Sequence, residues 1–99
     1  MIRGTTPRLE FTLPFEASLL AEAWITISQN RKEIFTKELE DCECNGEMLI
    51  LDLTQDETLQ LGCEYVAELQ IRAKTYTGEV IASDIIQLNA ERILKDGVI

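Results

Sequence analysis

Histidine is absent from the 99 residues of this chain. Because histidine is the commonest general base near neutral pH and the commonest metal ligand, its absence excludes Ser-His and Cys-His catalytic pairs. The five glycines are isolated from one another, which excludes a glycine-rich phosphate-binding loop. We therefore assign no catalytic residue, no cofactor and no metal ligand, and we expect a protein that is not an enzyme.

Long apolar runs are also missing. The longest of them have four residues, as at Met48–Leu51, whereas a membrane-spanning helix needs about 20. The first ten residues contain Arg3 and Arg8 and no apolar stretch, so no secretory signal peptide is expected. These absences predict a soluble cytoplasmic protein with no membrane partner.

Positive charge is scarce in the middle of the chain. The sequence has 9 lysines and arginines against 18 acidic residues, a net charge of −9 at pH 7. Residues 34–68 hold one base, Lys37, against ten acids. This field repels phosphate backbones, so direct nucleic-acid binding is not expected. The acidic segment has three interpretations, namely a solvated face, a docking surface for a basic partner and, least favoured, a cation site.

The three cysteines are Cys42, Cys44 and Cys63. A structural zinc site uses four Cys or His ligands, more than these cysteines provide, so free reduced thiols are expected. Acidic neighbours should raise the thiol pKa values of Cys42 and Cys44 and oppose nucleophilic use. Cys63, next to Gly62, is expected to be a small buried residue at the start of a strand.

Alternation of apolar and polar residues with a period of two is the main structural pattern of the chain. It predicts strands at residues 8–13, 23–28, 32–39, 47–53, 65–74 and 79–91. The last of these is expected to be the hairpin partner of 65–74. Trp24 is opposite in phase to Ala23, Ile25 and Ile27, which leaves open whether it is an exposed interface anchor or part of the core.

Helical patterns are short. Thr54 and Glu57 have the spacing of a capping box, which predicts one helical turn before Gly62. Residues 16–22 contain good helix formers and predict another turn before the next strand. Residues 89–97 have the cap and stop residues of a terminal helix, but extended structure to about Arg92 is favoured.

Residues 41–46 (Asp-Cys-Glu-Cys-Asn-Gly) match the start of a calcium-binding loop of the EF-hand type. An EF-hand loop lies between two helices, whereas strands are expected on both sides here. The favoured interpretation is therefore a hairpin loop with Asn45-Gly46 as its turn dipeptide.

Six to seven antiparallel strands in one domain, residues 1–99, predict an all-β fold. We expect an immunoglobulin-like β-sandwich with one or two short helical turns, and a five-stranded barrel is the alternative. The core cysteines that flank the Trp of antibody domains are missing, because Trp24 precedes every cysteine. Residues 1–7 are predicted to be a flexible arm and residues 93–99 a flexible tail.

Four segments, Met1–Pro7, Phe11–Phe15, Leu53–Leu59 and Ala82–Ile86, together resemble a family of small proteins from phages and prophages of Gram-positive bacteria. The resemblance covers nearly the whole chain, with the segments in the same order. It implies an immunoglobulin-like sandwich encoded near virion structural genes and a role as a tail-associated or baseplate-associated component. It implies no functional residue.

These observations predict a non-enzymatic structural or assembly module of a phage particle that acts through protein–protein contacts. Its expected partners are other phage structural proteins or further copies of itself, in the cytoplasm of the bacterial host during assembly and then in the virion. The alternative is a small acidic inhibitor of a host nucleic-acid-binding protein. The residues expected to make contacts are Glu40, Asp41, Glu43, Trp24, Leu94, Val98 and Ile99.

Overall fold

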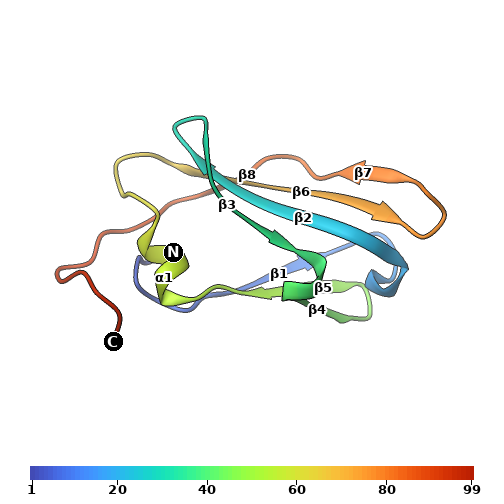
Figure 1. Ribbon diagram of the computed structural model, residues 1–99, viewed down its shortest axis with the longest axis horizontal. Coiled ribbons are helices and arrows are strands. Elements are labelled where there is room, and N and C mark those ends of the chain that lie inside the picture. Colours follow the sequence, from blue (N-terminus) through green and yellow to red (C-terminus); the bar gives the residue numbers. More distant parts are fainter.

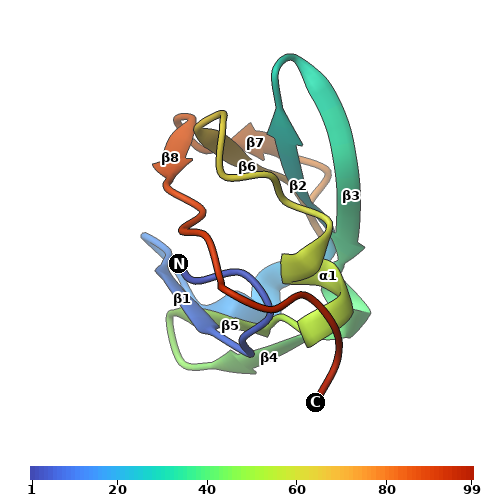
Figure 2. The same cartoon turned by 90° about the vertical axis from the view of Figure 1, so that its left-hand side faces the viewer.

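Two antiparallel β-sheets face each other across a layer of apolar side chains in the computed structural model, which describes residues 1–99 (Figure 1, Figure 2). The smaller sheet has the order β1-β5-β4, and the larger has the order β3-β2-β6-β7, with β8 also paired to β6. The strands are β1 (Arg8–Thr12), β2 (Leu20–Gln29), β3 (Lys32–Glu38), β4 (Cys42–Asn45), β5 (Met48–Asp52), β6 (Ala67–Thr75), β7 (Val80–Ala82) and β8 (Ile86–Leu88). The predicted all-β class is confirmed.

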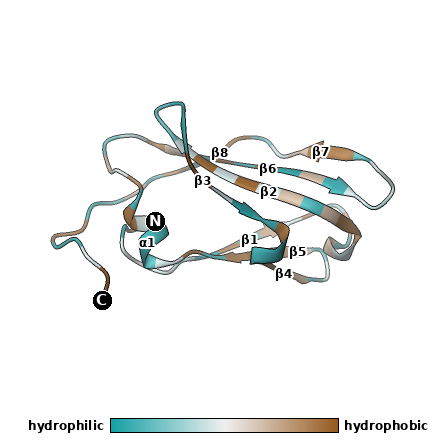
Figure 3. Cartoon of the chain, viewed as in Figure 1, coloured by the Kyte–Doolittle hydropathy of each residue, from teal (hydrophilic) through white to brown (hydrophobic).

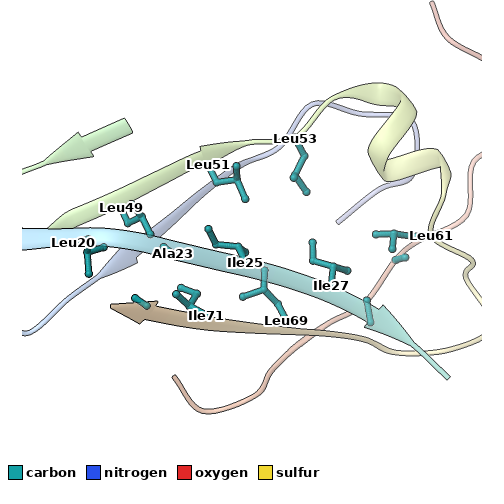
Figure 4. Close-up of a cluster of buried hydrophobic side chains, with 13 residues drawn as sticks. Leu20, Ala23, Ile25, Ile27, Leu49, Leu51, Leu53, Leu61, Leu69 and Ile71 are labelled. Atoms are coloured by element: carbon teal, nitrogen blue, oxygen red, sulfur yellow. The ribbon is translucent and has the colours of Figure 1, made fainter. Parts of the chain in front are cut away.

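The core follows from the alternation of the strands. Odd-numbered residues from Ala23 to Gln29 in β2, and from Ala67 to Ala73 in β6, are buried. Leu49 and Leu51 of β5 face them from the smaller sheet (Figure 4). Each fully buried Ile or Leu contributes about 1.5–3 kcal/mol relative to an exposed one, so this layer holds the two sheets together.

Three short helical elements connect the strands: the 3-10 helices η1 (Ala17–Leu19) and η2 (Leu39–Asp41) and the α-helix α1 (Gln55–Leu59). The predicted capping box begins α1, since Thr54 Oγ1 accepts the Glu57 N–H at 3.2 Å and Glu57 Oε1 accepts the Thr54 N–H at 2.9 Å. Before β2 the helical structure is limited to η1, because β2 already begins at Leu20. None of the helices is long and apolar enough to cross a membrane.

The hairpin expected around residues 41–46 joins different strands from those predicted. β3 pairs with β2 through a turn at Asn30 and Arg31, both with positive φ, as a type I′ hairpin requires. Because that turn places β3 in the larger sheet, η2 carries the chain across to the smaller one. Residues 42–45 then form β4 and pair with β5 around Gly46, whose φ is +59°.

The strand count is eight, above the six to seven predicted. One addition is β4, and the other comes from the division of the expected strand 79–91 into β7 and β8. Ser83 causes the division: its N–H donates to the Ile71 carbonyl at 2.8 Å, and its Oγ accepts the Ile71 N–H at 3.0 Å. Two residues then lie opposite Gln70, as in a β-bulge.

Both chain ends lie against the rest of the fold. Ile2 forms a parallel bridge with Glu91, and the Arg3 guanidinium donates to the Leu59 carbonyl at 2.9 Å. At the other end, the backbone of Ile99 exchanges hydrogen bonds of 2.7 and 3.0 Å with the side chain of Gln55. No helix forms over residues 89–97. The flexibility of residues 1–7 and 93–99 stays a prediction. Motion of either end would require its bridge or hydrogen bonds to the rest of the fold to break.

Candidate interaction surface

The outer face of the larger sheet carries an exposed tryptophan. Trp24 lies on the opposite face of β2 from the buried Ala23 and Ile25, and 53% of its surface is exposed. The structure therefore resolves the alternative that the alternation left open and places Trp24 at the surface. Tryptophan offers a large, rigid apolar area together with one N–H donor, and it is enriched at the energetic centres of protein interfaces.

Trp24 lies between a base and an acid. In the strand register it is directly opposite Arg72 of β6 on one side and Glu38 of β3 on the other. The Arg72 guanidinium carbon is 5.7 Å from the centroid of the Trp24 ring, within the range of a cation–π contact. The sheet thus holds an acid, an aromatic ring and a base side by side in one row.

The neighbouring row also places an acid next to a base. Glu22 of β2 is opposite Lys74 of β6, and Lys74 is opposite the exposed Val80 of β7. In Figure 3, β7 is brown, the colour of hydrophobic residues, and the ends of β3 and β6 are teal, the colour of hydrophilic ones. In these two rows the charge therefore changes from acidic at β3 and β2 to basic at β6, with the apolar Val80 at β7.

Two shallow hollows flank Trp24. One, of about 150 Å³, is lined on its charged side by Arg72 and Lys74. The other, of about 350 Å³, is lined by Glu38 and Glu40 together with Leu39. Trp24 and Glu22 line both hollows. We refer to the residues Glu22, Trp24, Glu38, Glu40, Arg72, Lys74 and Val80 as the Trp24 surface.

The acidic half of the Trp24 surface is crowded with like charges. A hydrogen bond with the Glu40 carboxyl, and then repulsion from its charge, raise the pKa of Glu38, and Asp41 and Glu22 add to this increase. The ion pairs of the protein lie elsewhere, at Arg3–Asp96, Arg8–Asp52 and Lys37–Glu57. Because neighbouring carboxylates disfavour each other's ionised form, this half would be stabilised by a cation brought by a partner.

Of the three predicted acidic contact residues, Glu40 and Asp41 lie together in η2, and Glu43 is separated from them. Glu40 lies beside Trp24, and Asp41 accepts the Glu38 N–H at 2.9 Å, which holds η2 in place. Glu43 lies on the outer face of the smaller sheet, next to Ile50. There its charge raises the pKa of Arg8, after the larger effects of the hydrogen bond and charge of Asp52.

The predicted apolar contact residues of the tail form a separate region. Leu94, Val98 and Ile99 are exposed, and none of them lines the hollows beside Trp24. The tail lies near α1 (Figure 2), where Asp96 accepts a hydrogen bond from Arg3 at 3.1 Å. The structure thus separates into different regions the contact residues that the sequence suggested as one set.

The basic half of the Trp24 surface was missed by sequence reasoning. Arg72 and Lys74 have even numbers in the alternating strand, and this phase was enough to predict that they face outward. The sequence pattern did not show that β6 lies next to β2, and only this pairing brings the two bases to Trp24.

The cysteines have different surroundings, and all three are free. Burial first, and then the charge of Asp41, raise the pKa of Cys42 to about 11, which confirms the predicted direction for that thiol. Cys63 is exposed, so its predicted burial is wrong. It lies in the surface connection between α1 and β6 and not at the start of a strand.

Comparison with known proteins identified no relative of this chain. A scan against protein-family models matched none, and searches of curated proteins and of solved structures found no match.

Proposed function

We propose that this chain is a non-enzymatic interaction module that makes protein–protein contacts through its Trp24 surface. The observation that carries the proposal is the exposure of Trp24 at the centre of a regular sheet, between two hollows. Trp and Arg are the residues most enriched among those that dominate binding energy, and here they contact each other. Their strands β2 and β6 are paired along almost their whole length, so the surface is ordered before a partner arrives.

We further propose an immunoglobulin-like form for the two sheets. With β1, β2, β3, β4, β5 and β6 taken as strands B, C, C′, D, E and F, and β7 with β8 as strand G, the sheets are B-E-D and C′-C-F-G. This agrees with the strand order of immunoglobulin domains. The Trp that such domains bury on strand C corresponds to the exposed Trp24 here, and Ile25 takes the inward position. This difference supports a surface role for Trp24.

The biological setting that we propose is a phage particle, in which the chain is a structural or assembly component associated with the tail or baseplate. Support for this setting comes from the resemblance at Met1–Pro7, Phe11–Phe15, Leu53–Leu59 and Ala82–Ile86. Partners are then other phage structural proteins or further copies of the chain. The protein acts in the host cytoplasm during assembly and is carried into the virion.

Affinity capture from a phage-induced lysate of the source bacterium tests this function. The tagged wild-type chain should recover tail or baseplate proteins, identified by mass spectrometry, and should retain them at high salt. Trp24→Ala should lose them. Tyr65→Ala is the matched control, because Tyr65 is 51% exposed and lies outside both hollows. Equal recovery by the wild type and Trp24→Ala, or no phage protein recovered, would contradict the proposal.

The second candidate function is an acidic inhibitor of a host nucleic-acid-binding protein. The observation in its favour is that Glu22, Glu38 and Glu40 line one hollow, with Asp41 next to Glu40 in η2. A hydrogen bond with Glu40 and the charges of these neighbours raise the pKa of Glu38. Affinity based on these charges should collapse as salt rises, because surface charges are screened beyond about 8 Å at 0.15 M salt. Charge reversal at Glu40, Asp41 and Glu43 should abolish inhibition. Because Glu40 also belongs to the Trp24 surface, the salt dependence and not this variant separates inhibition from an assembly role. Recovery of a salt-released host enzyme would favour this candidate.

A further inference from the structure

The Trp24 surface has flanks of opposite charge on the two sides of β2, and one acid, Glu22, lies on β2 itself and lines both hollows. Glu38 and Arg72 are the direct neighbours of Trp24 on β3 and β6. Glu40 lines the hollow on the first side, and Lys74 lines the hollow on the second. Since adjacent strands are about 4.8 Å apart, acid and base are separated by about 10 Å with the ring between them.

Such a surface is complementary to itself under two-fold symmetry. When a two-fold axis lies in the plane of contact and runs along β2, the β3 side of one copy faces the β6 side of the other, and Trp24 meets Trp24. We propose that the Trp24 surface is the interface of a symmetric homodimer, in which Glu38 and Glu40 of each copy face Arg72 and Lys74 of the other. This inference rests on the proposed function for its premise that this face binds protein.

The charges favour a second copy over other occupants. A basic partner would be attracted by Glu38 and Glu40 and repelled by Arg72 and Lys74. An acidic partner would be attracted by the two bases and repelled by the two acids. A partner therefore needs both charges, in reversed order, at the same spacing, with an apolar group between them. A second copy meets these requirements by symmetry, and Glu22, which lies near the axis, is opposite Lys74 of its own chain.

The apolar residues follow the same symmetry. Val80 lines the basic hollow from β7, beyond β6, and Leu39 of η2 lines the acidic one, where it follows Glu38 in the chain. In the dimer, Val80 of one copy faces the hollow that contains Leu39 of the other. The interface then has an aromatic centre, two charged zones and an apolar contact at each margin.

Charge exchange tests the proposed arrangement. In 0.15 M salt, sedimentation analysis of the wild-type protein should show a concentration-dependent dimer. Glu38→Arg and Arg72→Glu should each raise the dimer Kd by about tenfold or more, because symmetry repeats every change. The double variant E38R/R72E should recover most of the wild-type affinity, since each new Arg faces a new Glu in the other copy.

A control variant and an independent measurement accompany this test. Glu68→Arg makes the same kind of change on the outer face of β6 but outside both hollows beside Trp24, so it should leave the Kd unchanged. Trp24 is the only tryptophan of the chain. Its fluorescence emission should therefore shift to longer wavelength when the dimer is diluted to monomer, and circular dichroism should show that every variant is folded.

Three results would overturn the homodimer: a wild-type chain that stays monomeric at high concentration, a dimer that tolerates Glu38→Arg, and a double variant no better than the single ones. A monomer that still captures phage structural proteins through Trp24 would leave the proposed function standing. A dimer with the expected charge exchange that captures no phage protein would support the interface and refute the phage role.

Discussion

Lys37 of β3 and Glu57 of α1 form an ion pair of 2.5 Å that ties the larger sheet to the helical turn that follows the smaller sheet. The two side chains are only 20% and 14% exposed. Burial acts to raise the pKa of Glu57, but hydrogen bonds from Lys37 and from the Thr54 backbone outweigh it and lower that pKa. The hydrogen bond that Lys37 donates to Glu57, aided by the negative charge of Glu57, in turn raises the pKa of Lys37.

Replacement of Lys37 by Met should lower the free energy of unfolding by about 1–3 kcal/mol at pH 7, because the partly buried Glu57 loses its partner. Chemical denaturation measures this difference. Arg8→Met is the control, since its ion pair with Asp52 is more than half exposed and should matter little. Equal effects of the two substitutions would contradict the structural role of the Lys37–Glu57 pair.

The cost of Lys37→Met should depend on pH with a definite sign. The lowered pKa of Glu57 means that its contribution is present above the unfolded value of about 4.3 and is lost as pH falls through the folded pKa. The raised pKa of Lys37 means that its contribution is present below about 10.4 and is lost as pH rises through its folded pKa. The difference between wild type and variant should be widest between these limits and should narrow in acid. A difference that grows in acid would refute this assignment.

Gln29 is the buried polar side chain at the end of β2. Its amide accepts the Gly62 N–H at 2.8 Å and donates to the carbonyls of Gly62 at 2.7 Å and Tyr65 at 2.9 Å. Gln29→Leu should cost about 2–3 kcal/mol of unfolding free energy, because these backbone groups lose their partner away from water. Hydrogen exchange of the Gly62 amide should accelerate at the same time. Unchanged exchange there would show that the loop does not depend on Gln29.

Trp24 and Ile25 are neighbours in the sequence whose substitutions should have opposite effects. Ile25→Ala removes a fully buried core side chain and should lower stability by about 2–5 kcal/mol. Trp24→Ala should change the melting temperature little while it abolishes the contacts proposed above. Thermal melting of both variants measures the contrast. A large loss of stability in Trp24→Ala would place the ring in a structural role.

The three thiols should differ in reactivity. Because the pKa of Cys42 is raised to about 11, almost none of this thiol is ionised to thiolate at pH 8. Cys44 and Cys63 are exposed and should be alkylated first by iodoacetamide, with Cys42 modified last in a time course followed by mass spectrometry. Early modification of Cys42 would show that its strand opens readily.

The sequence by itself determined the local elements of this protein. Alternation predicted β1, β3, β5 and β6 closely, and the spacing of Thr54 and Glu57 predicted α1. Such features depend on interactions between residues near each other in the chain, and these are visible in the sequence. The outward phase of Arg72 and Lys74 was visible in the same way.

Tertiary structure alone decided which strands became neighbours. At η2 the chain leaves the larger sheet, so that β4 and not β3 pairs with β5, and Ser83 divided the last strand where its hydroxyl replaced a backbone carbonyl. Pairing of β4 with β5 separated Glu43 from Glu40, and pairing of β6 with β2 brought Arg72 to Trp24. Strand pairing joins residues that are distant in the chain, and the periodicity of one strand carries no information about its neighbour. The surface around Trp24 is for that reason a product of the fold.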